Sequence, residues 1–220
     1  MMENPNKICF IICVNNDFWF RECVRYIEWL DVPEGMEIEI LEIREAASMT
    51  AGYNEGMNST DAKYKVYMHQ DAFIINRFFI HDILSIFKQN AGIGMIGMVG
   101  SEHIPENGVM WTESRVQEAP EKAAWENYRY DVKDGLWNVA CVDGLLMVTQ
   151  YDVPWREDLF DGWDFYDVSQ SCEMRKRGYE VVVPVQKHAW YIHDDKRVLS
   201  LWNYDKYRKI FIEHYMQPEM

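Results

Sequence analysis

The sequence has 220 residues, of which 48% are hydrophobic and 26% charged, and this composition is typical of one globular domain with a sizeable core. Its formal net charge of −14 argues against DNA or RNA as a partner, because phosphate backbones need a basic face. A small phosphorylated ligand bridged by a cation remains compatible with that charge. The chain shows no signal peptide and no apolar run near the ~20 residues of a membrane-spanning helix, and its five cysteines form no CxxC pair. We therefore expect reduced thiols and a cytoplasmic protein, which a partner could hold at the inner face of the membrane.

Strands and helices alternate through the first hundred residues. Apolar runs or strict alternation predict strands, and apolar residues at helical spacing predict helices. In chain order these are a strand at 7–15, a helix at 17–30, a strand at 36–43, a helix at 46–62, a strand at 63–68, a helix at 77–90 and a strand at 92–100.

The second half is less regular. From about 100 to 135 the chain is polar and aromatic, with Trp111 and Trp125, which predicts a long excursion near the functional site. Regular patterns then predict a strand at 138–149, a helix at 163–178, a strand at 179–184 and a helix at about 201–215. Strands that alternate with helices imply one α/β domain over 1–220, whose mostly parallel sheet is covered by helices on both faces.

The stretch "KYKVYMHQDAF" ends an apolar strand in His69, Gln70 and Asp71. Parallel sheets bind ligands beyond the carboxyl ends of their strands, so the Asp71 carboxylate can ligate a divalent cation there. The structural alternative is a helix cap, since Asp71 and Asn76 both precede the helix at 77–90.

Two further acids, Asp164 and Asp167, lie three residues apart at the start of the helix at 163–178, so both can face one side of its first turn. Stabilisation of the helix dipole is the alternative reason for acids at that place. Trp163 beside them is a candidate partner for stacking on a sugar ring.

Asp143 and Gly144 interrupt the apolar run "CVDGLLMV". A glycine there marks a bulge or a close approach of the backbone to a ligand, and a plain turn between two short strands explains it equally well. His188 and His193 follow the strand at 179–184. His193 is either a metal ligand or a lone polar residue in a loop.

Four stretches, in this order, resemble the inverting glycosyltransferases of family 2 type over nearly the whole chain. "IICVNN" is similar to that family's first strand, whose end meets the nucleotide base. "GYNEGMNSTDAKYKVYMHQDAF" resembles the Arg-Asn-x-Gly motif followed by a strand that ends in the DxD metal motif. "YDVSQSCEMRKRGYEVVVP" resembles the Glu-Asp helix, and "DGWDFYD" resembles the Gly-Trp-Gly-Gly-Glu-Asp loop of galactosyltransferases, whose Trp contacts the sugars.

The resemblance implies a GT-A fold, a Rossmann-like α/β/α sandwich with a nucleotide-binding half at 1–100 and an acceptor and catalytic half at 101–220. It implies a metal-dependent inverting hexosyltransferase of polysaccharide biosynthesis, which moves a sugar from a nucleoside diphosphate donor, expected to be a UDP-sugar, to a glycan or other hydroxyl acceptor. The implied cofactor is Mn²⁺ or Mg²⁺, held by Asp71 and His193, and the implied catalytic base is Asp167. The remaining implied residues contact the donor (Cys13, Val14, Asn15, Arg44, Asn54, Gln70 and Asp71) or the acceptor and its sugar (Asp143, Gly144, Trp163 and Asp164).

Four positions depart from the family pattern. His69 replaces the first Asp of DxD, Tyr166 the Glu before the base, Glu173 the helix Arg, and Tyr53 stands where Arg usually precedes Asn54. The His-Gln-Asp and Phe-Tyr-Asp stretches resemble a divergent glycosyltransferase-like branch whose metal motif is HQD, so we interpret the departures as marks of a subfamily. The substituted DxD and Glu-Asp positions also favour an alternative, a catalytically silent protein that binds nucleotide sugars on the same fold. A metal-dependent phosphohydrolase or nucleotidyltransferase is a further alternative, but it would use several carboxylates around two cations, and the sequence offers one convincing strand-end acid.

Overall fold

The computed structural model describes residues 2–110, 115–116, 135–186, 188–194 and 202–217. The strands of its central sheet are β1 (Asn4–Val14), β2 (Glu37–Arg44), β3 (Ala62–His69), β5 (Ile93–Gly97), β8 (Leu136–Asn138), β10 (Leu146–Thr149) and β11 (Glu180–Pro184). The other strands are β4 (Ala72–Ile74), β6 (Gly100–Ser101), β7 (Arg115–Val116), β9 (Cys141–Val142) and β12 (Tyr191–His193). The described helices are α1 (Asp17–Glu28), α2 (Met49–Ser59), α3 (Phe79–Gln89), α5 (Tyr166–Lys176) and α6 (Tyr204–Tyr215).

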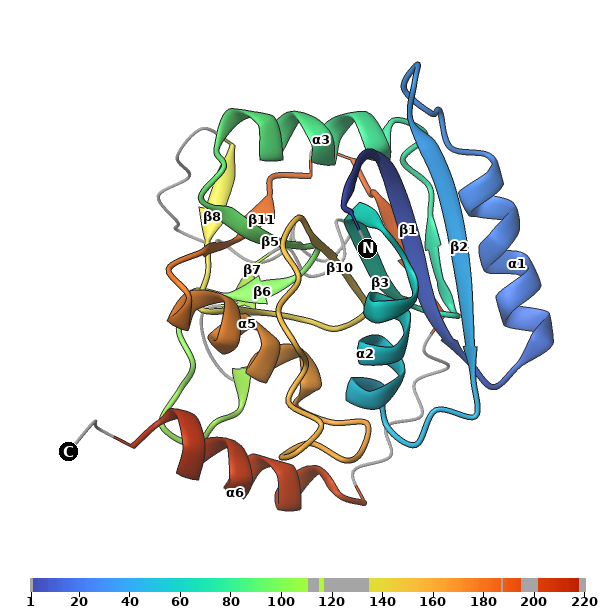
Figure 1. Ribbon diagram of the computed structural model, residues 1–220. Helices are drawn as coiled ribbons and strands as arrows, with labels where there is room; N and C mark the ends of the chain where they lie inside the picture. Colours follow the sequence, from blue (N-terminus) through green and yellow to red (C-terminus); the bar gives the residue numbers. More distant parts are fainter. Residues whose placement is uncertain (1, 111–114, 117–134, 187, 195–201, 218–220) are drawn as a thin grey trace.

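The central sheet has seven strands in the order β2-β1-β3-β10-β5-β11-β8 (Figure 1). β1 pairs in parallel with β2 and β3, and β5 pairs in parallel with β11. β10 runs antiparallel to both β3 and β5, and β8 runs antiparallel to β11. All strands except β10 and β8 therefore point the same way, which confirms the predicted mostly parallel sheet.

Helices cover both faces of this sheet (Figure 1). Successive residues of β1 alternate between two cores, because side chains along a strand point to opposite faces. Ile8 and Phe10 lie in the core beneath α1 and α3, and Cys9 and Ile11 lie in the core beneath α2 and α5. A third core, with Phe211 of α6, packs that helix outside α5. The chain is therefore an α/β/α sandwich, as predicted.

The single strand predicted at 138–149 is wrong, since β8, β9 and β10 occupy this range as three short strands of two different sheets. β9 runs antiparallel to β6, with Val142 opposite Gly100, and β10 continues antiparallel to β5, with Met147 opposite Gly97. The chain thus keeps its direction between β9 and β10, and its register shifts there. At this place the Asp143 side chain accepts a hydrogen bond from the backbone N–H of Leu145, at 2.7 Å. Such a bond stabilises a turn rather than an extended strand. The alternative of a plain turn at Asp143 and Gly144 is thus the one observed.

A two-stranded sheet of β4 and β12 joins distant parts of the chain. Its antiparallel register places Tyr191 opposite Ile74 and His193 opposite Ala72. The backbone N–H of Asp194 also donates to the carbonyl oxygen of Asp71, at 3.0 Å. His193 therefore lies on a strand rather than in a loop, directly beside the carboxyl end of β3.

Several predicted helices are longer than the observed ones. α2 begins at Met49 because the Ser48 hydroxyl accepts the N–H of Ala51, at 3.1 Å, and caps the helix. α5 begins only at Tyr166, because Phe165 has a φ of 62° in the left-handed region. Trp111, Trp125 and most of the predicted excursion at 100–135 lie outside the described residues, as does residue 201, the predicted start of the last helix. The described helix α6 begins at Tyr204.

The five cysteines all lie within the described residues, and all are free thiols. Burial raises the pKa of the thiols of Cys9, Cys13, Cys23 and Cys172 to about 12, so these groups are not nucleophiles at neutral pH. Among the described helices, none combines the length and the apolar character needed to cross a membrane.

Candidate active site

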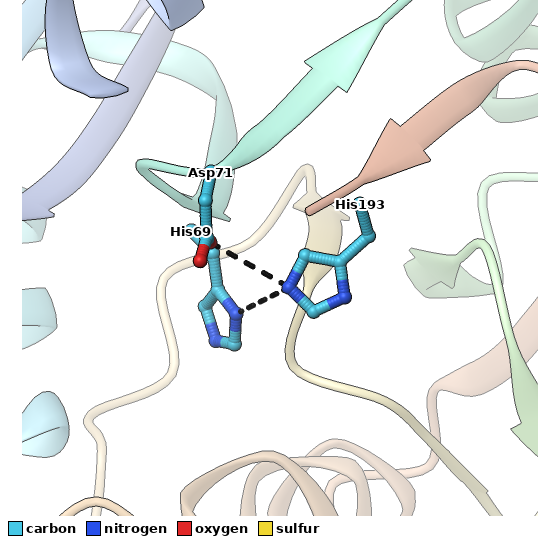
Figure 2. A group of neighbouring side chains, drawn as sticks. All are labelled: His69, Asp71 and His193. Atoms are coloured by element: carbon cyan, nitrogen blue, oxygen red, sulfur yellow. Dashed lines mark hydrogen bonds and ion pairs between the residues drawn. The ribbon is translucent and has the colours of Figure 1, made fainter. Parts of the chain in front are cut away.

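His69, Asp71 and His193 form a cluster at the carboxyl end of β3, with their ligand atoms all within 4.8 Å of one another. Figure 2 shows the two imidazole rings next to each other, with the Asp71 carboxylate near both. His69 Nδ1 lies 3.5 Å from His193 Nε2, and the same His193 nitrogen lies 3.5 Å from Asp71 Oδ1. Two imidazoles and a carboxylate at this spacing can hold a divalent cation.

The pKa shifts of His69 and Asp71 suit metal binding, which requires neutral imidazoles and an ionised carboxylate. Desolvation and the neighbouring His193 lower the pKa of His69, which keeps its imidazole neutral. Burial acts to raise the pKa of Asp71, but its hydrogen bond with His193 and the two imidazoles outweigh that effect, so the pKa is lowered. The cluster therefore has the ligand types that a transition-metal ion needs, and His69 and Asp71 have the required charges.

Gln70, which lies between His69 and Asp71 in the chain, connects the end of β1 to this site. Its Oε1 accepts the backbone N–H groups of Asn15 and Asn16, at 3.1 and 3.0 Å, and its Nε2 donates to Asn15 Oδ1. Asn16 in turn caps α1 by accepting the N–H of Phe18, at 3.0 Å. Two predicted donor-binding residues, Asn15 and Gln70, are thus brought together beside the cluster.

The remaining predicted donor residues on the sheet lie at the carboxyl ends of β1 and β2. Cys13 stands opposite His69, and Val14 stands opposite Arg44. Cys13 is half-buried and Val14 is buried, whereas Arg44 is exposed and forms an ion pair of 2.6 Å with Asp17. These strand ends form one continuous edge that leads to His69.

Asn54 of α2 has a clear structural contact. Its side-chain Nδ2 donates to the carbonyl oxygen of Trp155, at 2.9 Å, and its Oδ1 accepts the N–H of the same residue, at 2.8 Å. Tyr53 beside it is fully buried and packs on Tyr67 and Trp155, with ring centroids 5.0 and 4.8 Å apart. Tyr53, the departure before Asn54, is therefore a core residue, and a contact of Asn54 with the donor stays a prediction.

Asp167 lies in the first turn of α5 and is half-buried. Its carboxylate accepts the backbone N–H of Gly144 and that of Val168, both at 2.8 Å. Desolvation, and next the charge of Asp143, raise the pKa of Asp167 to about 7. A carboxyl group with this pKa can accept a proton at neutral pH and release it again.

Tyr166 connects the metal-ligand cluster to the region of Asp167. Its phenolic oxygen lies 2.6 Å from His69 Nε2. Its ring also lies against Gly144, where a Cβ atom would come within 2.1 Å of the phenolic oxygen. Contacts therefore run without a break from the cluster of Asp71, through His69 and Tyr166, to the turn that binds Asp167.

The loop before α5 carries Trp163 and Asp164. The backbone N–H of Met49 donates to the carbonyl of Gly162, at 2.9 Å, and the Thr50 hydroxyl donates to the carbonyl of Phe160, at 2.6 Å. Trp163 is 52% exposed, so its ring is available to a ligand from solvent. Asp164 is half-buried, and burial raises its pKa.

Glu173 shows why another departure from the family pattern is structural. It forms ion pairs with Arg177, at 2.9 Å, and with Arg156, at 3.5 Å, and accepts the hydroxyl of Tyr215 of α6, at 2.9 Å. The acid therefore joins α5 to α6 and to the preceding loop. His69 is different, because the sequence did not predict it as a third member of the cluster. The available signal is its place, since His69 is the last residue of β3 and Asp71 lies two residues on, in the turn that follows.

The sequence profile described as "Glycosyltransferase like family" matches residues 9–215. No curated protein matches the sequence.

Solved structures resemble the chain in fold. GalNAc-T7 with UDP, GalNAc and Mn²⁺ has a TM-score of 0.59 and 8% identity, over 83% of this chain and 43% of that one. The mannosyltransferase PcManGT from Pyrobaculum calidifontis with GDP-Man and Mn²⁺ has a TM-score of 0.53 and 12% identity, over 84% and 59% of the two chains. TarS from S. aureus in complex with UDP-GlcNAc has a TM-score of 0.58 and 10% identity, over 94% and 66%. The present chain thus spans less than two-thirds of each, and identities this low show the fold alone, which is the predicted GT-A fold.

Proposed function

Because the chain belongs to the glycosyltransferase-like family, we propose that it transfers a sugar from a nucleoside diphosphate donor to a hydroxyl group of an acceptor, with inversion at the anomeric carbon. The observation that carries this proposal is the cluster of His69, Asp71 and His193 at the carboxyl end of β3, in contact through Tyr166 with the region of Asp167. A cation site and a proton acceptor on one connected surface are the two elements that the reaction needs.

His69, Asp71 and His193 would hold the divalent cation, which when bound supplies positive charge to the departing diphosphate. Imidazole ligands favour Mn²⁺ over Mg²⁺, since Mg²⁺ prefers oxygen ligands and retains several waters. Mn²⁺ in the structures of GalNAc-T7 and PcManGT supports the same choice.

Asp167 would act as the catalytic base. As the acceptor oxygen forms its bond to the anomeric carbon and the bond from that carbon to the diphosphate oxygen breaks, the hydroxyl proton passes to the Asp167 carboxylate. The pKa of about 7 suits this step, and a positioned general base contributes roughly 10²–10⁴-fold in rate. A single base without a covalent intermediate gives inversion.

The donor would lie along the ends of β1 and β2, in the half of the chain at 1–100. Cys13, Val14, Asn15 and Arg44 line this edge, and Gln70 joins it to the cluster. UDP in the complexes of GalNAc-T7 and UDP-GlcNAc in that of TarS support a UDP-sugar, although PcManGT holds GDP-Man.

The acceptor would enter from the half at 101–220. Asp143 and Gly144 lie beside Asp167, and the exposed ring of Trp163 with Asp164 follows at the loop before α5. An exposed aromatic ring next to carboxylates suits a glycan, since sugar rings stack on aromatic faces and their hydroxyl groups donate to acids. We therefore place the protein in polysaccharide biosynthesis.

A thermal-shift panel of UDP, GDP and their sugars, with and without Mn²⁺, tests the proposal, because ligands that bind the native state raise its apparent stability. We expect a shift with a nucleoside diphosphate that depends on Mn²⁺. Donor hydrolysis or transfer then separates an enzyme from a silent nucleotide-sugar-binding protein. A panel without any Mn²⁺-dependent shift would rule out both.

A further inference from the structure

We infer that Tyr166 is a positioning residue for the metal ligand His69, and that it presents the Nδ1 atom of that imidazole to the cation. This inference rests on the proposed cation site and goes beyond it. The two nitrogens of His69 have separate neighbours, since Nε2 lies 2.6 Å from the Tyr166 phenolic oxygen and Nδ1 lies 3.5 Å from His193 Nε2. The Tyr166 hydroxyl therefore contacts Nε2 of His69, and Nδ1 of His69 remains directed toward His193 and the cluster.

This arrangement decides the tautomer of His69. A neutral imidazole that gives its Nδ1 lone pair to a cation must carry its proton on Nε2, so Nε2–H donates to the phenolic oxygen of Tyr166. Histidine ligands generally donate their second ring N–H to an acceptor that fixes the orientation of the ring. In this chain the acceptor is a tyrosine from a different element, the first residue of α5.

The position of the Tyr166 hydroxyl is fixed from several sides. The ring is buried and packs on Tyr53 and Trp155, with centroid distances of 5.9 and 6.3 Å. Gly144 lies so close that any larger residue there would overlap the phenolic oxygen. Phe165, in the left-handed conformation, turns the chain so that Tyr166 starts α5 facing inward.

Positions 69 and 166 lie 97 residues apart and depart together from the family pattern that the sequence resembles. Their contact makes them one functional pair rather than two separate substitutions. Because Asp167 follows Tyr166 directly, the same first turn of α5 orients the metal ligand and carries the proposed base.

The Mn²⁺ affinity of the purified protein, measured by electron paramagnetic resonance, tests the inference. Replacement of Tyr166 by Phe removes only the hydroxyl, and loss of such an acceptor weakens metal binding by roughly 10–100-fold. Tyr53→Phe is the matched control, since Tyr53 is fully buried in the same aromatic cluster and its hydroxyl has no hydrogen-bond partner within the described chain. We expect tenfold or greater loss of affinity in Tyr166→Phe and a change below twofold in Tyr53→Phe.

Equal affinity of wild type and a folded Tyr166→Phe variant would overturn the inference while leaving the cation site intact. A wild-type protein that binds no Mn²⁺ would instead remove the cation site, and the inference with it. If Tyr166→Phe does not fold, ¹⁵N spectra of histidine-labelled wild type after chelator treatment give the answer. We expect the Nε2–H tautomer for His69, and a dominant Nδ1–H tautomer would contradict the assignment.

Discussion

The backbone N–H of Gly144 donates a hydrogen bond of 2.8 Å to the carboxylate of Asp167, and this bond joins two different elements of the site. Gly144 belongs to the turn between β9 and β10, whereas Asp167 belongs to the first turn of α5. A main-chain donor fixes the carboxylate without neutralising it by a salt bridge. The acid is therefore oriented and remains able to accept a proton.

Replacement of Asp167 by Asn should preserve the fold and greatly slow turnover. The Asn oxygen can still accept the N–H of Gly144, but the amide cannot take a proton, so we expect unchanged UDP affinity and a fall in kcat of about 10²–10⁴-fold. Calorimetry with UDP and Mn²⁺ and an assay of UDP release measure the two quantities. Asp205→Asn on the exposed face of α6 is the control, and a normal rate in Asp167→Asn would remove Asp167 from the role of base.

Asp167 should also make stability depend on pH. Its pKa of about 7 lies above the value of about 3.9 for an unfolded aspartate, so the folded state binds this proton more tightly. The resulting stabilisation is fully present below about pH 4 and is lost as pH rises through about 7, by up to about 1.4 kcal/mol per pH unit. Urea unfolding at several pH values should therefore show wild type losing stability relative to Asp167→Asn, and parallel curves would contradict the raised pKa.

Replacement of Gly144 by Ala should lower the stability of the fold and also weaken Mn²⁺ binding at His69. The new Cβ atom would lie 2.1 Å from the Tyr166 phenolic oxygen, and overpacking of this kind costs typically about 1–3 kcal/mol. We expect lower stability in urea and weaker Mn²⁺ binding, because the hydroxyl must leave His69. Gly35→Ala is the control: it strains a φ of 81° with no neighbour within 4 Å, so it should lower stability without changing Mn²⁺ affinity. Equal Mn²⁺ affinity of Gly144→Ala and wild type would show that the tyrosine moves freely.

The alternation of strands and helices could be predicted because apolar residues recur at a different spacing in strands and in helices. β1 is apolar on both faces, and β2, at the edge of the sheet, alternates polar and apolar residues. The place of Asp71 follows from the same signal, since an apolar strand of a parallel sheet ends there. These features are local, and the structure reproduces them within a few residues.

The pairing of β4 with β12 could not be predicted in this way. Strands of three residues show no period, and the contact joins Ala72 to His193 across more than a hundred residues of chain. The sequence left a bulge and a plain turn at Asp143 and Gly144 equally open, because apolar residues on both sides of this pair resemble one strand. The resemblance to the family is therefore what assigns His193 to the metal site. The same resemblance makes His69 a departure from DxD, although His69 completes the cluster.

Replacement of Asp71 by Asn should abolish the Mn²⁺-dependent part of UDP binding. Asp71 is the only carboxylate of the cluster of His69, Asp71 and His193, so its loss removes the anionic ligand that offsets the charge of the cation. Calorimetric titration of UDP with and without Mn²⁺ measures the difference, which we expect to vanish in the variant. Asp61→Asn is the matched control, because Asp61 directly precedes the opposite end of β3 and pairs with Lys7 at 2.9 Å. Undiminished Mn²⁺-dependent affinity in Asp71→Asn would place the cation elsewhere in the molecule.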